Sequence, residues 1–178
     1  MKIGKKNAVI VAHPDDESLW AGSLLADRGP EFDVIVCSIP RREPERAWKF
    51  FDVAKLLGFH PRVYPVLEPS GANFPMTHLH NIDIWGYDLI VTHNEKGEYG
   101  HLHHRQVHDW VKREAKGEIA YFGYGIEGEE LSHQNLEVKQ QAIQCYDHPS
   151  ALTDEPKYIE LMRRYYPDGL TAETYVYA

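Results

Sequence analysis

Apolar runs and amphipathic stretches alternate along the chain. Ala8 to Ala12 are five consecutive apolar residues, which predict a strand buried on both faces of a parallel sheet. Further strands are predicted at 32–39, 63–66, 87–92, 119–124 and 171–177. Helical spacing predicts helices at 18–26, 43–57, 101–116, 135–146 and 155–165, and a Pro- and Gly-containing loop is predicted at 68–81. This alternation indicates a single α/β domain over 1–178, with a Rossmann-like, mostly parallel sheet covered by helices on both faces.

Composition narrows the class of protein. A length of 178 residues, 43% hydrophobic and 26% charged, is typical of one globular domain with a real core. The net charge of -8 argues against a nucleic-acid partner, because no broad basic face could neutralise phosphates. Two cysteines are too few for a disulfide framework, and no apolar stretch reaches membrane-spanning length. We therefore expect a cytoplasmic protein without a membrane span.

A polar cluster follows the first predicted strand at once. Residues 12–17 read Ala-His-Pro-Asp-Asp-Glu, at what should be the carboxyl end of that strand, where ligands bind in open α/β sheets. One imidazole and two carboxylates there, His13, Asp15 and Asp16, suggest a divalent metal, most plausibly zinc. The alternative is structural, an acidic residue that caps the next helix.

A second cluster stands at the start of the predicted 101–116 helix. His101 and His104 are three residues apart and would share a helix face, with His103 pointing elsewhere. The alternative is a set of surface histidines on an exposed first turn. Two independent clusters, each at a predicted strand end, favour one joint site.

With these motifs the sequence resembles the metal-dependent de-N-acetylases, the LmbE-like family that includes the N-acetylglucosaminyl-phosphatidylinositol and mycothiol-pathway deacetylases. Its AHPDDE motif is intact at 12–17, and its GH-x-x-H motif is present at 100–104. The resemblance covers residue 7 to about residue 125. It implies removal of an acetyl group from an N-acetylated amino sugar, of the N-acetylglucosamine type, by a hydrolase with one zinc ion per chain.

The resemblance also implies roles for individual residues. Metal ligands would be His13, Asp16 and His104; Asp15 would be the general base, and a protonated His101 would stabilise the oxyanion. The residue types agree, because two imidazoles and one carboxylate leave an open coordination position, as in catalytic zinc sites. Asp15 would take a proton from water and later deliver it to the leaving amine.

The chain departs from the family pattern at two places. Leu102-His103 stands where relatives usually have Pro-Asp, so His103 would replace an aspartate that holds His13 or another ligand. The chain is also short for the family, at its C-terminal side. We expect an open cleft, with substrate contacts from Arg46, Glu98 and Tyr99; for Arg46 a solvated helix face is the alternative.

Other functions remain to be weighed against this one. A nucleotide-binding protein is disfavoured, because the loop after the first strand lacks G-x-G-x-x-G and its acids would repel a pyrophosphate. A hydrolase of another small amide stays open, as does a metal-binding protein without turnover, although that reading gives Asp15 no task. A homo-oligomer is also left open.

Overall fold

A six-stranded sheet with the order β3-β2-β1-β4-β5-β8 forms the centre of the chain. The computed structural model describes residues 3–68, 76–123, 129–130, 132–146 and 172–177. Five strands are parallel and β8 runs antiparallel to β5. The strands of this sheet are β1 Asn7–Val11, β2 Phe32–Val36, β3 His60–Val63, β4 Leu89–Thr92, β5 Glu118–Phe122 and β8 Tyr175–Tyr177. The short strands β6 Glu129–Glu130 and β7 Ala172–Glu173 form a separate antiparallel pair.

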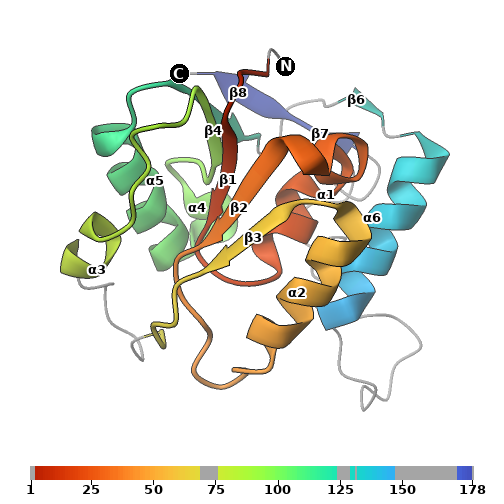
Figure 1. The fold of residues 1–178 in the computed structure, drawn as a ribbon, viewed down its shortest axis with the longest axis horizontal. Coiled ribbons are helices and arrows are strands. Elements are labelled where there is room, and N and C mark those ends of the chain that lie inside the picture. The colour runs from red at the N-terminus through yellow and green to blue at the C-terminus, as the bar shows by residue number, and fades with distance from the viewer. Residues whose placement is uncertain (1–2, 69–75, 124–128, 131, 147–171, 178) are drawn as a thin grey trace.

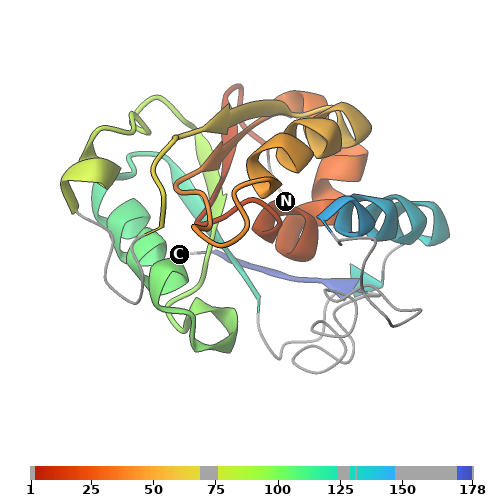
Figure 2. The ribbon, with the colours of Figure 1, turned by 90° about the horizontal axis from the view of Figure 1, so that it is seen from below.

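Helices cover both faces of the sheet (Figures 1 and 2). They are α1 Asp16–Arg28, α2 Arg46–Leu57, α3 Met76–His80, α4 Gly97–Gly100, α5 Leu102–Glu114 and α6 His133–Tyr146, with a 3-10 turn at Gly29–Glu31. The helices α1, α2 and α6 lie together on one face, and α3, α4 and α5 lie on the other. The alternation of β1 follows this division: Val9 and Val11 enter the core under α1 and α2, whereas Ala8 and Ile10 enter the core under α5.

The order of the strands places a switch point at the centre of the sheet. From β1 the chain moves outward to β2 and β3, then returns to the other side of β1 for β4 and β5. The carboxyl ends of β1 and β4 therefore open beside each other, with their loops diverging. In open α/β sheets this is the place where ligands bind.

Most predicted elements are present, with some shifts in their bounds. The edge strand is β3 at His60–Val63, not 63–66, because Pro65 lies beyond the stretch that pairs with β2. The predicted loop 68–81 contains the helix α3, which is five residues long and too short to show helical periodicity; its Leu79 is fully buried. The end of α2 is as predicted, with Gly58 in the left-handed region (φ 78°).

The C-terminal predictions have mixed outcomes. The stretch 171–177 forms two short strands, β7 and β8, in place of one. The predicted helix 155–165 lies outside the described residues. Within the described part of the chain, no helix is both long and apolar enough to cross a membrane.

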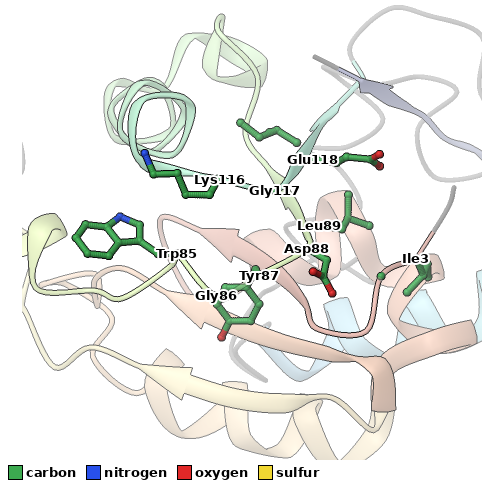
Figure 3. A pocket seen from close by; sticks show the side chains of 11 residues that line it. Ile3, Trp85, Gly86, Tyr87, Asp88, Leu89, Lys116, Gly117 and Glu118 are labelled. Carbon is green, nitrogen blue, oxygen red and sulfur yellow. The ribbon is translucent and has the colours of Figure 1, made fainter.

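A hollow on the surface lies at the amino ends of β4 and β5, the edge of the sheet opposite to the switch point (Figure 3). It is lined by the segments 85–89 and 116–119, and Trp85 stands at its side. The histidines of the two sequence clusters are not among its lining residues. The candidate chemistry therefore lies elsewhere, at the carboxyl ends.

Candidate metal and catalytic site

The first cluster continues directly from β1. The backbone N–H of His13 donates to Asp16 Oδ2 (2.9 Å), which ties the loop to the first turn of α1. Asp15 stands at the N-cap position of α1 but makes no capping hydrogen bond with its side chain. The capping alternative for Asp15 is therefore wrong.

His13, Asp16 and His104 come together as the sequence predicts. Asp16 Oδ2 lies 3.6 Å from His13 Nδ1, and Asp16 Oδ1 lies 3.2 Å from His104 Nε2. Ligands of a tetrahedral zinc ion, each about 2.0–2.1 Å from the metal, are separated from one another by about 3.3 Å. The three side chains are almost fully buried. Both distances from Asp16 are close to this separation.

One atom supports a metal directly. His104 Nε2 is buried and has no hydrogen-bond partner among the described residues, although it faces a carboxylate. A buried nitrogen without a partner is costly unless something binds it. Burial alone would lower the pKa of His104, but Asp16 and Glu98 outweigh it and raise that pKa to about 10. The same contacts hold the pKa of Asp16 well below its usual value, against the effect of burial.

Glu98 fixes the orientation of His104. Its Oε2 lies 2.6 Å from His104 Nδ1 and 2.9 Å from His93 Nδ1, and its Oε1 accepts the Asn94 backbone N–H (3.0 Å). With the Nδ1 proton donated to Glu98, His104 turns the lone pair of Nε2 toward Asp16. Burial would raise the pKa of Glu98, but His93 and His104 lower it to about 2.

His93 is a second candidate ligand, which the sequence did not single out. With Asp16 and His104 it forms a buried group that could hold a metal. Its Nε2, however, accepts the Ala12 backbone N–H (3.0 Å), and its Nδ1 faces Glu98. Both ring nitrogens of His93 are thus engaged with the Ala12 N–H and with Glu98, which favours a supporting role for His93.

Asp15 is held in a strained position beside the metal group. Its φ of 118° is unusual for any residue but glycine, and such strain is concentrated at functional sites. The Glu17 carboxylate accepts the Asp15 N–H (3.0 Å) and is itself fixed by Ser18 and by Tyr146 (2.7 Å each). Burial raises the pKa of Glu17. Through its hydrogen bond with the Asp15 N–H, Glu17 helps to fix the loop between β1 and α1.

Arg46 reaches the site from the start of α2. Its Nη1 lies 2.6 Å from Asp15 Oδ2, and its other nitrogen pairs with Glu43. Only 13% of the Arg46 side chain is exposed. The alternative of a solvated helix face is wrong for Arg46.

His101 lies next to His104 but not for the predicted reason. The helix α5 begins at Leu102, and His101 is the extended N-cap residue (ψ 126°), so the two do not share a helix face; their ring centroids are 4.5 Å apart. Burial and the neighbouring His104 and His13 lower the pKa of His101 to about 3. In the metal-free site this lowered pKa favours a neutral His101, whereas the sequence argument expects a protonated one. The Tyr99 ring covers this pair, with centroids 5.8 Å from His101 and 5.5 Å from His104.

His103 does not point away from the site. It is buried, and its Nδ1 lies 3.3 Å from His13 Nε2 and 2.9 Å from Glu68 Oε1. The contact with His13 is the one expected if His103 stands in for an aspartate. Glu68, from the segment after β3, was absent from the sequence argument, because no local pattern links it to either motif.

The predicted site residues thus fall into distinct positions. His13, Asp15, Asp16, His101 and His104 converge at the switch point, and Arg46 and Tyr99 border them. Glu98 is only 2% exposed and occupied by two imidazoles, a position that suits holding ligands and not substrate. The strand-end position of His93 and the place of Glu17 in the 12–17 motif were signals for these two residues; Glu68 had none.

Comparison with known proteins adds to this geometry. No family model matches the chain. A curated relative, 1D-myo-inositol 2-acetamido-2-deoxy-alpha-D-glucopyranoside deacetylase of Corynebacterium diphtheriae, is 45% identical over 40 residues. That match covers 21% of this chain and only 14% of the relative.

Solved structures share the whole fold. N,N'-diacetylchitobiose deacetylase from Pyrococcus horikoshii aligns with 98% of this chain and 84% of its own (TM-score 0.68, 14% identity). The zinc-inhibited form of teicoplanin deacetylase Orf2 aligns with 97% of this chain and 98% of its own (TM-score 0.59, 16% identity). The fold is that of these deacetylases. Together the matches support the LmbE-like family that the two motifs indicate.

Proposed function

We propose that the chain is a zinc-dependent hydrolase that removes the acetyl group from an N-acetylated amino sugar conjugate. One observation carries the proposal: a group of two imidazoles and one carboxylate lies at the switch point, beside a second, strained carboxylate. Catalytic zinc sites have three protein ligands and keep the fourth position open. A structural zinc site would fill that position.

His13, Asp16 and His104 would hold the metal. When bound, zinc supplies a Lewis acid that polarises the amide carbonyl and activates a water molecule. Glu98 keeps His104 in the tautomer that this role requires, because it accepts the Nδ1 proton. Zinc is the finer part of the proposal; the donor set suits any small divalent ion that accepts nitrogen and oxygen ligands.

Asp15 would be the general base. It is next to the proposed ligand Asp16, in a backbone conformation that is unusual for any residue but glycine (φ 118°). The ion pair with Arg46 holds the carboxylate in place (2.6 Å). Asp15 would take the proton of the attacking water and deliver it to the nitrogen of the leaving amine.

His101 would stabilise the oxyanion as a neutral imidazole. Its lowered pKa leaves it uncharged at neutral pH, so it would act as an N–H donor and not as a cation. Its Nδ1 is buried without a hydrogen-bond partner among the described residues, which leaves that ring nitrogen uncommitted within the site. The charge that builds on the carbonyl oxygen would meet this donor.

The substrate class comes from the relatives. Their names describe deacetylation of an acetamido-deoxy-glucopyranoside and of N,N'-diacetylchitobiose, both N-acetylated amino sugars. In this chain Tyr99, 37% exposed and packed beside His101, offers a flat surface for a sugar ring. Arg46, paired with Asp15 and Glu43, borders the same site. A hydrolase of another small amide stays the alternative.

Two neighbouring aspartates allow a sharp test. Asp15→Asn should keep the metal content of the wild type and lower turnover by about two to four orders of magnitude, the usual worth of a general base. Asp16→Asn should lose metal and activity together, because a neutral amide is a poor zinc ligand. Metal content is measured after gel filtration, and turnover is measured as acetate released from free, nucleotide-linked, lipid-linked and oligomeric N-acetylglucosamine.

The outcomes separate the alternatives. If Asp15→Asn loses the metal and Asp16→Asn keeps it, the two roles are reversed. A protein that holds about one zinc ion per chain but releases no acetate from any of these substrates is a metal-binding protein or a hydrolase of another amide. A wild-type chain that binds no divalent metal refutes the proposal as a whole.

A further inference from the structure

We propose that Glu68 is a positioning residue that fixes His13 for metal binding, in the way that Glu98 fixes His104. The inference rests on the proposed function, since it takes His13 and His104 as metal ligands. It assigns a role to a residue outside both sequence motifs. Its basis is an arrangement of side chains that occurs twice in this site.

The first arrangement surrounds Glu98. One oxygen of its carboxylate, Oε2, receives Nδ1 of the ligand His104 (2.6 Å) and Nδ1 of the non-ligand His93 (2.9 Å). A histidine that binds a metal through one nitrogen usually donates the proton on its other nitrogen to a carboxylate, a backbone carbonyl or water. His104 satisfies this rule through Glu98.

The second arrangement surrounds Glu68. One oxygen, Oε1, lies 2.9 Å from Nδ1 of the non-ligand His103 and 3.7 Å from Nε2 of the ligand His13. Among the described residues, Glu68 is the carboxylate that the structure places at the Nε2 side of His13; Asp16 faces the Nδ1 side. In each arrangement a single oxygen faces one ligand imidazole and one supporting imidazole.

The positions of the protons on the His13 and His103 rings also indicate that Glu68 supports His13. With the metal at Nδ1, His13 carries its proton on Nε2. His103 Nδ1 is 3.3 Å from that nitrogen, but it also faces the negatively charged Glu68 oxygen at 2.9 Å and is better used as a donor to it. Glu68 Oε1 then faces the His13 proton as a charged acceptor, and the 3.7 Å distance must shorten by about 0.5 Å to make the hydrogen bond.

The position of Glu68 is itself secured. Its backbone N–H donates to the Ile39 carbonyl (2.8 Å), where an isolated bridge joins Ile39 to Leu67. Its carbonyl accepts from Arg41 (3.3 Å). The side chain is 27% exposed, so its carboxylate lies at the edge of the site while it faces His103 and His13. Exposure at this level means that glutamine can replace it without creating a buried defect.

The test is metal affinity, with zinc alone as the probe and a chromophoric chelator as competitor. Glu68→Gln should bind zinc about 10–100-fold more weakly, the usual cost of losing such a support. His103→Asp in the Glu68→Gln background should recover most of that loss, because it places a carboxylate beside His13 Nε2. Glu68→Asp, which keeps the charge on a shorter arm, should lose less affinity than Glu68→Gln.

Glu114 provides a control, because it is also a glutamate that faces a histidine but lies away from the site. Glu114 Oε1 lies 3.8 Å from His80 Nδ1, and its side chain is 24% exposed, close to the values for Glu68 and His13. Glu114→Gln should leave zinc affinity within twofold of the wild type. Circular dichroism of the metal-free variants checks that each one is folded.

Several results would overturn the inference. One is unchanged zinc affinity in Glu68→Gln; another is a loss that His103→Asp fails to recover while the double variant remains folded. A third is that the wild type binds two zinc ions and Glu68→Gln binds one, since His13, Glu68 and His103 would then be a metal site of their own. The proposed function fails separately, when the wild type binds no metal or no variant of Asp15 affects turnover.

Discussion

Replacing Glu98 by glutamine removes one negative charge from the buried cluster under His104 and hardly changes its shape. The carboxylate has three partners: the Nδ1 atoms of His93 and His104 on one oxygen and the Asn94 N–H on the other. A glutamine has only one oxygen to accept from them. Whichever way the amide turns, its NH2 group faces a donor, so a buried hydrogen bond is lost.

The size of the effect follows from the pKa of Glu98. A carboxyl whose pKa falls from 4.5 to about 2 is stabilised by about 3 kcal/mol in its ionised form relative to a neutral one. Glutamine is neutral, as is the protonated carboxyl. Glu98→Gln should therefore lower the free energy of unfolding of the metal-free protein by about 3 kcal/mol at neutral pH. It should also weaken zinc binding by about 10–100-fold, because His104 loses its fixed orientation.

The difference in unfolding free energy between the wild type and Glu98→Gln should depend on pH. The folded-state pKa of Glu98 is depressed, so its stabilisation is fully present above the unfolded value near 4.5 and is lost as pH falls through about 2. The gap between wild type and Glu98→Gln should thus be largest near pH 6 and narrow below pH 4.5. It should also narrow above about pH 6.5, because the part of the His104 stabilisation that depends on Glu98 is lost as pH rises toward the His104 pKa of about 10. Urea unfolding in the presence of a chelator measures it.

A surface variant provides the control for this experiment. Glu31 pairs with Arg28 at the surface, with 43% of its side chain exposed, and such pairs contribute about 0–1 kcal/mol. Glu31→Gln should therefore stay within that range at every pH. If Glu98→Gln is as stable as Glu31→Gln at pH 7, the charge cluster does not stabilise the fold as described.

Two further predictions concern protons and a buried ion pair. His104 has a pKa of about 10 in the metal-free chain but must be neutral to bind zinc, so zinc uptake at pH 7.5 should release about one proton. Calorimetry in two buffers of different ionisation enthalpy measures the number of protons released. Zinc binding without proton release would contradict the proposed site. Lys139 is fully buried and pairs with Glu173 at 2.6 Å. Lys139→Met should cost about 3–5 kcal/mol of unfolding free energy, because the Glu173 carboxylate stays buried without its cation; a loss below 1 kcal/mol in thermal or urea unfolding would refute this.

The sequence by itself determined the sheet and the place of the site. Five apolar residues before His13 can only be buried on both sides, and a strand of that kind needs parallel neighbours and helices on both faces. The polar residues that follow must then lie at the carboxyl end of a central strand. For the same reason Asp15, Asp16 and the second histidine cluster could be assigned to one site before any distance was known.

Helical periodicity in the sequence predicted side-chain positions wrongly where the chain leaves regular structure. The helix α5 begins one residue after His101, which lies in an extended conformation. The helix-face argument therefore paired His101 with His104 for the wrong reason and turned His103 away from a site that it faces. A helix that begins one residue later leaves His101 outside the regular helical spacing, so the helix-face argument no longer applies to that residue.

Only the tertiary structure decided which groups support the ligands. Glu68 lies 55 residues from His13 in the chain (positions 68 and 13), and it meets the site because β3 returns the chain beside β2. Tyr146 reaches Glu17 because α6 packs on α1. The protonation of His101 and His104 likewise depends on burial and on charges from separate segments. Local sequence patterns do not predict such contacts, because side chains far apart in the sequence meet only after the sheet has formed.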